Sequence, residues 1–360
     1  MPEESGGHWA NLAAAQKLTQ SMKIPGVFEE DIKRNNPIDR VTVGQAANSG
    51  LKIEWLREQP AAVTAIEAAV ADIDIGDQLA WTEDVDYDEK EMTLRRCYIQ
   101  RKLDKFLPGI YGTYNNYEAR SLLEAEKGLK RKLGARIVYA DNTYTSAKQF
   151  DGLHALAYEH GTPYTAGSAY DQKNIDNGDA GLSLIFLRTM MDAMLHGVDE
   201  LWAPYEVIRR MDAAYQERGF LQAAANTTSM AFISMGYNEL GKRVLFWDGA
   251  PLIRTDYLVA EDDDTGTGAD GAARALYASG DKVYSMFAIK HGNVLNQEPG
   301  LTFAYGGTEG MGDLYKLVRF PELEDYDAGG LRLVNYGALL LGSSLCLGRI
   351  FDIQDAAITI

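Results

Sequence analysis

Two strand-like segments, separated by a long stretch without a core of its own, place the strongest constraint on how this chain can fold. Leu51 to Trp55 alternates apolar and charged residues, and the alternation returns at Met92 before Cys97-Tyr-Ile. A period of two predicts half-buried strands. The connection of about thirty residues between them is rich in Ala, Asp and Gly, and so long a connection in a compact domain is usually functional or protruding. We therefore expect an extended two-stranded arm.

The clearest predicted helix follows this arm and runs from Thr113 to Leu133, with Gly134 as the residue that ends it. Its apolar residues fall on one narrow stripe at the helical period, and charged residues occupy the opposite side. One face should therefore pack on a core while the other faces water. The stripe consists of Ala119, Leu122, Leu129 and Leu133.

The second half of the chain predicts a lobe of helices followed by strands. Asp179 can cap a helix from about Ala180 to His196 that is apolar on almost all sides, so we expect it to be deeply buried. A second helix is expected from Pro204 to Arg218. Asp248-Gly249 predicts a tight hairpin turn, because both residues accept positive φ angles. Further strands are expected at 283–289, 301–305, 314–320 and 331–341.

The whole pattern is that of an α+β protein of two or three lobes without an internal repeat. Its 35 Lys and Arg against 52 Asp and Glu give a net charge of −17, which disfavours unaided binding to nucleic acid. The only cysteines, Cys97 and Cys346, are too few for a disulfide framework or a cysteine-rich zinc site. We expect no secretory signal at Met1 to Gly7 and no membrane span, since the most apolar stretch, Gly337 to Gly348, is too short.

No motif points to catalysis, a cofactor or a metal. Gly266 to Gly271 spells G-x-G-x-x-G, but the aspartates from Asp262 to Asp264 precede it and would repel a pyrophosphate. Those aspartates lack the spacing of a calcium loop, so we expect Asp262–Gly271 to be an exposed, metal-free loop. The histidines are scattered without ligand spacing, and Ser168 lacks the surroundings of a nucleophile elbow.

The order of several short segments resembles the major capsid proteins of tailed phages, of the Hong Kong 97 type. The resemblance covers nearly the whole chain and rests on matches that follow one another in the same order. The matching segments are Asn11-Leu-Ala-Ala-Ala-Gln-Lys-Leu18, Asp77-Gln-Leu-Ala-Trp-Thr-Glu83, Tyr117-Glu-Ala-Arg through Lys132, Lys148-Gln-Phe-Asp-Gly-Leu153, and Leu331-Arg-Leu-Val-Asn-Tyr-Gly-Ala-Leu339.

This resemblance implies a division into an N-arm (1–40), an E-loop (41–101), a peripheral domain with a long spine helix (102–179 and 330–360) and an axial domain (180–329). It also implies a non-enzymatic function: self-assembly as pentamers and hexamers into an icosahedral shell. The shell would enclose double-stranded DNA without sequence-specific binding. The protein would be located in the virion, after synthesis and assembly in the host cytoplasm.

The implied partners are other copies of the chain, a portal, a separate scaffolding protein and, as an optional addition, a decoration protein. Members of this family with a fused scaffolding domain carry a long N-terminal extension ahead of the fold. Here only about ten residues precede the first predicted helix, Asn11 to Asp31, so the resemblance implies a separate scaffold. Apolar residues of the arm would contact neighbouring subunits, since a strip of this kind is normally covered by a partner. These residues are Leu51, Ile53, Trp55, Ile66, Val70, Ile73 and Ile75.

Two other functions stay open at this point. The first is an encapsulin-like nanocompartment shell, which encloses a cargo enzyme in place of DNA. The second, more distant, is a soluble acidic hydrolase whose site the motifs do not reveal.

Overall fold

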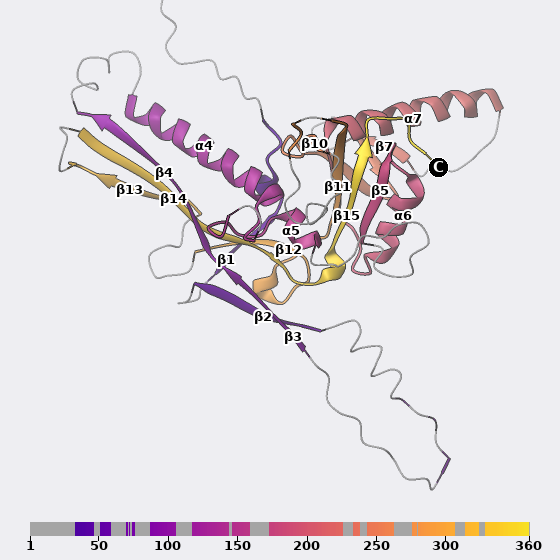
Figure 1. Cartoon of the computed structure of the whole chain (residues 1–360), viewed down its shortest axis with the longest axis horizontal. Coiled ribbons are helices and arrows are strands. Elements are labelled where there is room, and N and C mark those ends of the chain that lie inside the picture. Colours follow the sequence, from indigo (N-terminus) through magenta and orange to yellow (C-terminus); the bar gives the residue numbers. More distant parts are fainter. Residues whose placement is uncertain are drawn as a thin grey trace, which may run out of the picture.

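The structure of the protein is a computed structural model with two lobes, each built around its own sheet, and a hairpin that projects from the first lobe (Figure 1). Most of the predicted N-arm and of the loop expected at Asp262–Gly271 lies outside the described residues. Those residues are 33–46, 51–58, 70, 72, 74–75, 87–105, 117–143, 146–158, 173–225, 233–237, 243–262, 276–278, 280–306, 314–323 and 328–359.

The first lobe contains a five-stranded sheet. Its long strand β14 (Ala328–Leu341) pairs antiparallel with β4, β12 and β13, and β12 pairs in parallel with β1. Residues 330–334 pair with β13 and with β4, so β14 runs between these two strands. The other bounds are β1 Thr42–Ala46, β4 Arg95–Asp104, β12 Leu301–Gly306 and β13 Lys316–Phe320.

Helix α4 (Tyr117–Tyr139) packs across one face of this sheet (Figure 1). Its Leu129, Leu133 and Ile137 are buried in the core of the lobe, which confirms an amphipathic helix. The helix does not end at Gly134 but continues to Tyr139. The glycine permits a close approach, because a Cβ at this position would lie 2.3 Å from Oδ1 of Asn36.

The second lobe contains an eight-stranded sheet in the order β5, β15, β11, β6, β9, β8, β7, with β10 paired to β11. Two helices belong to this lobe, α6 (Leu184–Ala193) and α7 (Tyr205–Ala225). The strand bounds are β5 Asn174–Ala180, β6 Glu200–Ala203, β7 Ile233–Tyr237, β8 Arg243–Trp247, β9 Ala250–Arg254, β10 Glu261–Asp262, β11 Lys282–Ile289 and β15 Leu347–Gln354.

Helix α6 differs from its prediction in both its cap and its burial. Ser183 caps it, with a side chain that accepts from Phe186 N, whereas Asp179 lies in β5 with a φ of 53°. Ile185 is 60% exposed, so only one face of the helix is deeply buried. β5 continues past Asp179 to Ala180, and α6 begins only at Leu184. The sequence pattern does not reveal this later start of the helix. The turn at Asp248 and Gly249 is confirmed, with φ angles of 46° and 86° between β8 and β9.

A two-stranded hairpin of β2 (Lys52–Glu58) and β3 (Tyr87–Thr93) extends from the first lobe (Figure 1). The two predicted strands of the arm are therefore present. β3 continues almost directly into β4, with Leu94 as the single residue between them. The remaining short elements are α5 (Leu153–Tyr158) and the 3-10 turns η1 (Pro37–Asp39), η2 (Val294–Asn296) and η3 (Ser344–Cys346).

The two sheets divide the chain differently from the expected domain boundaries. β12 and β13 lie inside the span 180–329 that was assigned to the axial domain, yet both belong to the first sheet. β15 lies inside the returning span 330–360, yet it pairs with β11 and β5 in the second sheet. Likewise β1 and most of β4, inside the expected E-loop span 41–101, belong to the first sheet.

Candidate functional site

The base of the hairpin is anchored in this chain's own core. Ile53 and Met92 are buried there, at 4% and 8% exposure. Arg57 adds a hydrogen bond from Nη2 to the backbone oxygen of Leu341, at 2.8 Å. Ile53 therefore offers little surface to a neighbouring subunit, and its predicted contact stays a prediction.

The other predicted contact residues divide into three groups. Leu51 and Val70 are 68% and 76% exposed, and Ile75 is fully exposed. Trp55 is partly buried and packs against the core, and its Nε1 is buried without a hydrogen-bond partner among the described residues. The exposed apolar side chains fit a surface that a partner covers. Ile66 and Ile73 lie outside the described residues.

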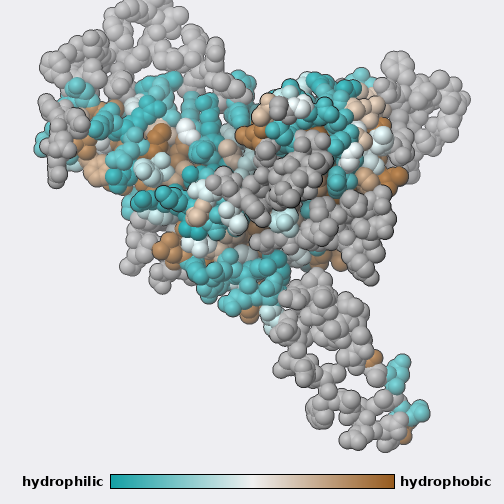
Figure 2. All heavy atoms as spheres, viewed as in Figure 1, coloured by the Kyte–Doolittle hydropathy of each residue, from teal (hydrophilic) through white to brown (hydrophobic). Residues whose placement is uncertain are grey.

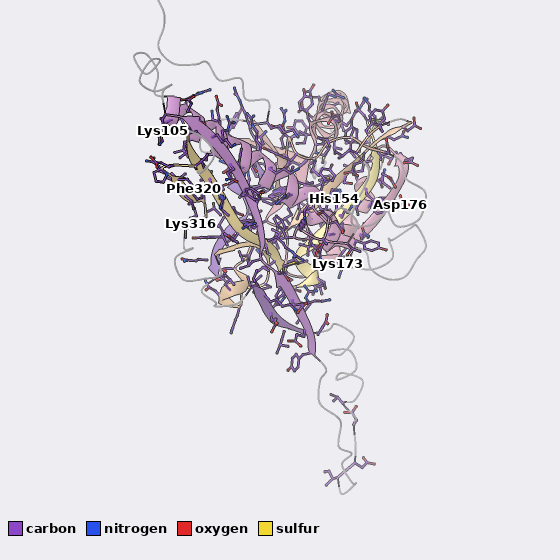
Figure 3. The ribbon with its side chains drawn as sticks, turned by 60° about the vertical axis from the view of Figure 1, so that its left-hand side comes forward. Lys105, His154, Lys173, Asp176, Lys316 and Phe320 are labelled. Atoms are coloured by element: carbon purple, nitrogen blue, oxygen red, sulfur yellow. The ribbon has the colours of Figure 1, made fainter. Side chains whose placement is uncertain are left out.

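A buried polar cluster joins the two lobes, with His154 of α5 at its centre (Figure 3). His154 Nδ1 lies 2.8 Å from Val138 O, and its Nε2 lies 3.0 Å from Glu261 Oε1. Ser285 Oγ donates to Glu261 Oε2 at 2.7 Å, and the Tyr139 hydroxyl donates to Oε1 at 2.9 Å. The ring of Tyr139 also stacks on that of His154, with centroids 4.6 Å apart.

The donors and acceptors in this cluster show how many protons it holds. A backbone oxygen can only accept, so Nδ1 of His154 carries a proton toward Val138. The contact between Nε2 and Glu261 then needs one more proton, on the ring or on the carboxyl. Burial lowers the pKa of His154, against the opposing effect of Glu261, and favours the neutral ring. Burial also raises the pKa of Tyr139.

This cluster is a structural connection and not an active site. His154 and Glu261 are fully buried, and a general acid or base must reach a substrate. The bonds tie α4 and α5 to β10 and β11 of the second sheet. Sequence reasoning missed the cluster, because Glu261 heads an acidic, glycine-rich stretch typical of a solvated loop. The available signal was His154 itself, since a histidine within an apolar helix needs a buried partner.

A second set of contacts reinforces the junction near η1 and β6. Arg40 Nη1 lies 3.1 Å from Glu200 Oε1. The other carboxylate oxygen of Glu200, Oε2, accepts from Trp202 Nε1 at 2.8 Å. Lys290 forms an ion pair with Asp199 at 2.6 Å. Arg40 comes from the segment that precedes β1, whereas Glu200 and Trp202 lie in β6 and Asp199 and Lys290 lie next to β6 and β11 of the second sheet. The contact between Arg40 and Glu200 therefore adds a polar link to that sheet.

The described residues contain no group of three or more His, Cys, Asp or Glu side chains that could hold a metal ion. In the same residues, no helix has the length and apolarity needed to cross a membrane. Of the loop expected at Asp262–Gly271, only Asp262 is described. It lies in β10, and its carboxylate accepts from Ala278 N at 2.8 Å.

No protein-family model and no curated protein matches the sequence. Solved structures match nearly the whole chain. A chain of the holo-SrpI encapsulin complex from Synechococcus elongatus PCC 7942 is 11% identical, with a TM-score of 0.60 and 97% of each chain covered. The capsid of a native GTA particle is 12% identical, with a TM-score of 0.54 and coverage of 95% of this chain and 98% of that one. The capsid of Myoviridae phage XM1 is 8% identical, with a TM-score of 0.54 and coverage of 94% and 97%.

Identities in this range show a common fold. The chain therefore has the α+β fold of the Hong Kong 97 type that its segment order predicts, and that fold is shared with phage capsids and with an encapsulin.

Proposed function

We propose that this chain is the major capsid protein of a tailed double-stranded DNA bacteriophage and assembles as pentamers and hexamers into an icosahedral shell. The observation that carries the proposal is the match of the capsid fold over 94% to 95% of the chain. The hairpin supports it, because Leu51, Val70 and Ile75 expose apolar surface that an isolated chain leaves uncovered.

Within this proposal each part of the structure takes a role. The first sheet with α4 as the spine helix is the peripheral domain, and the second sheet with α6 and α7 is the axial domain. The β2–β3 hairpin with the connection between its strands is the E-loop. The protein resides in the virion, and its partners are its own copies, a separate scaffolding protein, a portal and, as an optional addition, a decoration protein.

An encapsulin-like shell is the second candidate, favoured by the TM-score of 0.60 over 97% of both chains. Such a shell would hold a cargo protein and no genome. The net charge of −17 fits either content, because an acidic subunit does not bind DNA strongly.

Negative-stain microscopy and light scattering of the full chain, with and without a co-expressed scaffold, test the proposal. We expect closed shells, and particle diameter and contents then separate the two candidates. Nuclease-protected DNA in particles from infected cells supports the phage capsid, whereas a single enclosed protein supports the encapsulin. A monodisperse small oligomer at high concentration in both preparations contradicts the shell and favours the hydrolase.

A further inference from the structure

One face of the first sheet displays cations around a pocket of about 310 Å³ that no carboxylate lines. β14 pairs with β4 and with β13, and side chains alternate between the two faces of each strand. Ile99 of β4 faces α4, because its Cδ1 lies 3.7 Å from where a Cβ on Gly128 would be. The residues that line the pocket lie on the opposite face, and we call these eight residues the basic sheet face. They form three rows across the strands: Arg96 and Tyr336, then Tyr98, Val334 and Lys316, then Gln100, Arg332 and Val318.

Aromatic rings position the two arginines of this face. The guanidinium carbon of Arg96 lies 5.3 Å from the ring centroid of Tyr98, and that of Arg332 lies 4.8 Å from the ring centroid of Phe320. Within the described part of the chain, Arg96 has no hydrogen bond or ion pair, and Nε of Arg332 is buried without a hydrogen-bond partner. A guanidinium stacked on a ring keeps its N–H edge available for a carboxylate or phosphate. The face is therefore suited to an anion from outside the chain.

The two tyrosines of this face favour a nucleotide over other anions. Tyr98 is 55% exposed, and Tyr336 lies directly across from Arg96 on the neighbouring strand. The bases of a single strand stack on aromatic side chains while Arg and Lys bind the phosphates. An acidic peptide would use the cations and leave the rings unused, and a duplex keeps the faces of its bases inside its own stack. A single strand of nucleic acid therefore uses more of this face than either alternative.

The net charge of −17 acts over a distance, whereas this face acts at contact. At physiological ionic strength salt screens charges that are more than about 8 Å apart, so the nearest side chains dominate a contact. Figure 3 shows Lys316 and Phe320 on β13 at the outer edge of the first lobe, and Figure 2 shows hydrophilic residues gathered over that lobe. A phosphate that reaches the pocket therefore meets cations first.

We propose that the basic sheet face of the unassembled chain binds single-stranded nucleic acid. Arg96, Lys316 and Arg332 bind its phosphates. A base stacks on Tyr98, whose exposed ring lies in the middle row of the face. This inference goes beyond the proposed shell function and does not depend on it, because a shell of that kind encloses duplex DNA after assembly.

Fluorescence anisotropy of a short labelled oligothymidylate, mixed with the full chain below the concentration at which it assembles, tests this binding. We expect the single strand to bind about tenfold more tightly than a duplex of the same length, because base stacking adds to the phosphate contacts. Arg96→Ala should weaken binding and lower the slope of log K against log salt by about 0.7, the value for one phosphate contact on a single strand. Tyr98→Leu should weaken binding about tenfold and leave that slope unchanged, since it removes stacking and no charge.

Arg101→Ala is the matched control for Arg96→Ala. It removes the same charge from the same strand, but Arg101 lies on the side of α4, where it pairs with Glu124 at 3.3 Å. Its affinity for the oligothymidylate should equal that of the wild type. Tyr98→Phe keeps the ring and should also bind like the wild type, which separates lost stacking from a disturbed sheet. Circular dichroism checks that each variant is folded.

The outcomes separate this inference from the proposed function. Binding that Arg96→Ala and Arg101→Ala weaken equally, or a duplex that binds as tightly as the single strand, overturns the inference. A short polyglutamate peptide that displaces the oligothymidylate, together with no loss of binding in Tyr98→Leu, assigns the face to acidic polypeptides and also overturns it. If shells form and the chain binds no single strand, the shell function stands without this site. If the expected binding is found and no shells form, the site stands and the shell function fails.

Discussion

Asn36 occupies a position where a single side chain connects the segment before β1 with α4 and with Tyr257, which lies between β9 and β10 of the second sheet. Its Nδ2 donates to Lys130 O of α4 at 2.9 Å and to the Tyr257 hydroxyl at 3.3 Å, while Oδ1 accepts from Ile38 N at 3.2 Å. The side chain lies directly against Gly134. The absence of a Cβ at 134 is thus what allows the segment before β1 to approach the helix.

Two glycines of α4 should respond oppositely to the same substitution. Gly134→Ala should lower the free energy of unfolding by roughly 1–3 kcal/mol, because the new methyl group displaces Asn36 from buried hydrogen bonds. Gly128→Ala should raise it by up to about 1 kcal/mol, since alanine favours a helix and its Cβ would meet Ile99 Cδ1 at an ordinary 3.7 Å. Urea unfolding of the unassembled chain measures both. Stabilisation by Gly134→Ala would contradict the role assigned to Asn36.

The two cysteines should be unreactive in the folded chain. Burial raises the pKa of the Cys346 thiol to about 11 and also raises the pKa of Cys97, so little of the nucleophilic thiolate forms near pH 8. Neither side chain is accessible, at 0% and 5% exposure. A chromogenic aromatic disulfide should label neither thiol in the native protein and both after denaturation. Rapid native labelling of Cys97 would reveal opening of β4, contrary to this expectation.

At the scale of elements, the junction between the lobes depends on Glu261. Glu261→Ala removes the acceptor for the hydroxyls of Tyr139 and Ser285, and should lower the free energy of unfolding by roughly 1–3 kcal/mol for each buried donor left without a partner. Glu261→Gln should cost less than about 2 kcal/mol, because its amide oxygen accepts and its NH₂ group can donate to a neutral His154. Thermal unfolding of the two variants and the wild-type chain measures the two losses of stability. Equal losses would mean that His154 is charged in the native protein.

The elements themselves were more predictable than their arrangement. The alternation around Leu51 and Met92 and the dipeptide Asp248-Gly249 are local signals, and the expected strands and turn are present. The prediction that Gly134 ends the helix was wrong. A glycine that lets another segment approach a helix closely cannot be told from the sequence apart from one that ends a helix. The His154 cluster draws on residues more than a hundred positions apart, and their contact depends on sheet order, which no local period specifies.

At the scale of the whole molecule, the proposed shell would require identical copies to assemble despite a net charge of −17 on each. Like net charges repel, with a range that salt shortens to about 8–10 Å. Contacts between copies therefore need local complementarity or apolar burial. The hairpin offers apolar surface for such burial, since its base is fixed in the core through Ile53 while apolar side chains farther along it stay exposed.

The last prediction concerns the connection between the hairpin strands. Replacing Ala61–Gly76 by a short Gly-Ser turn should leave the subunit folded, because the described residues there, Val70 and Ile75 among them, are exposed and Ile53 and Met92 still anchor the base. Shell formation should fail, because the apolar contacts to a neighbour are lost. Circular dichroism melting of the shortened chain measures whether the subunit is folded, and its sedimentation profile measures whether shells form. A full-length control, Val70→Ser with Ile75→Ser, should weaken assembly without abolishing it. An unfolded monomer, or intact shells from the shortened chain, would mean that this segment does not act between subunits.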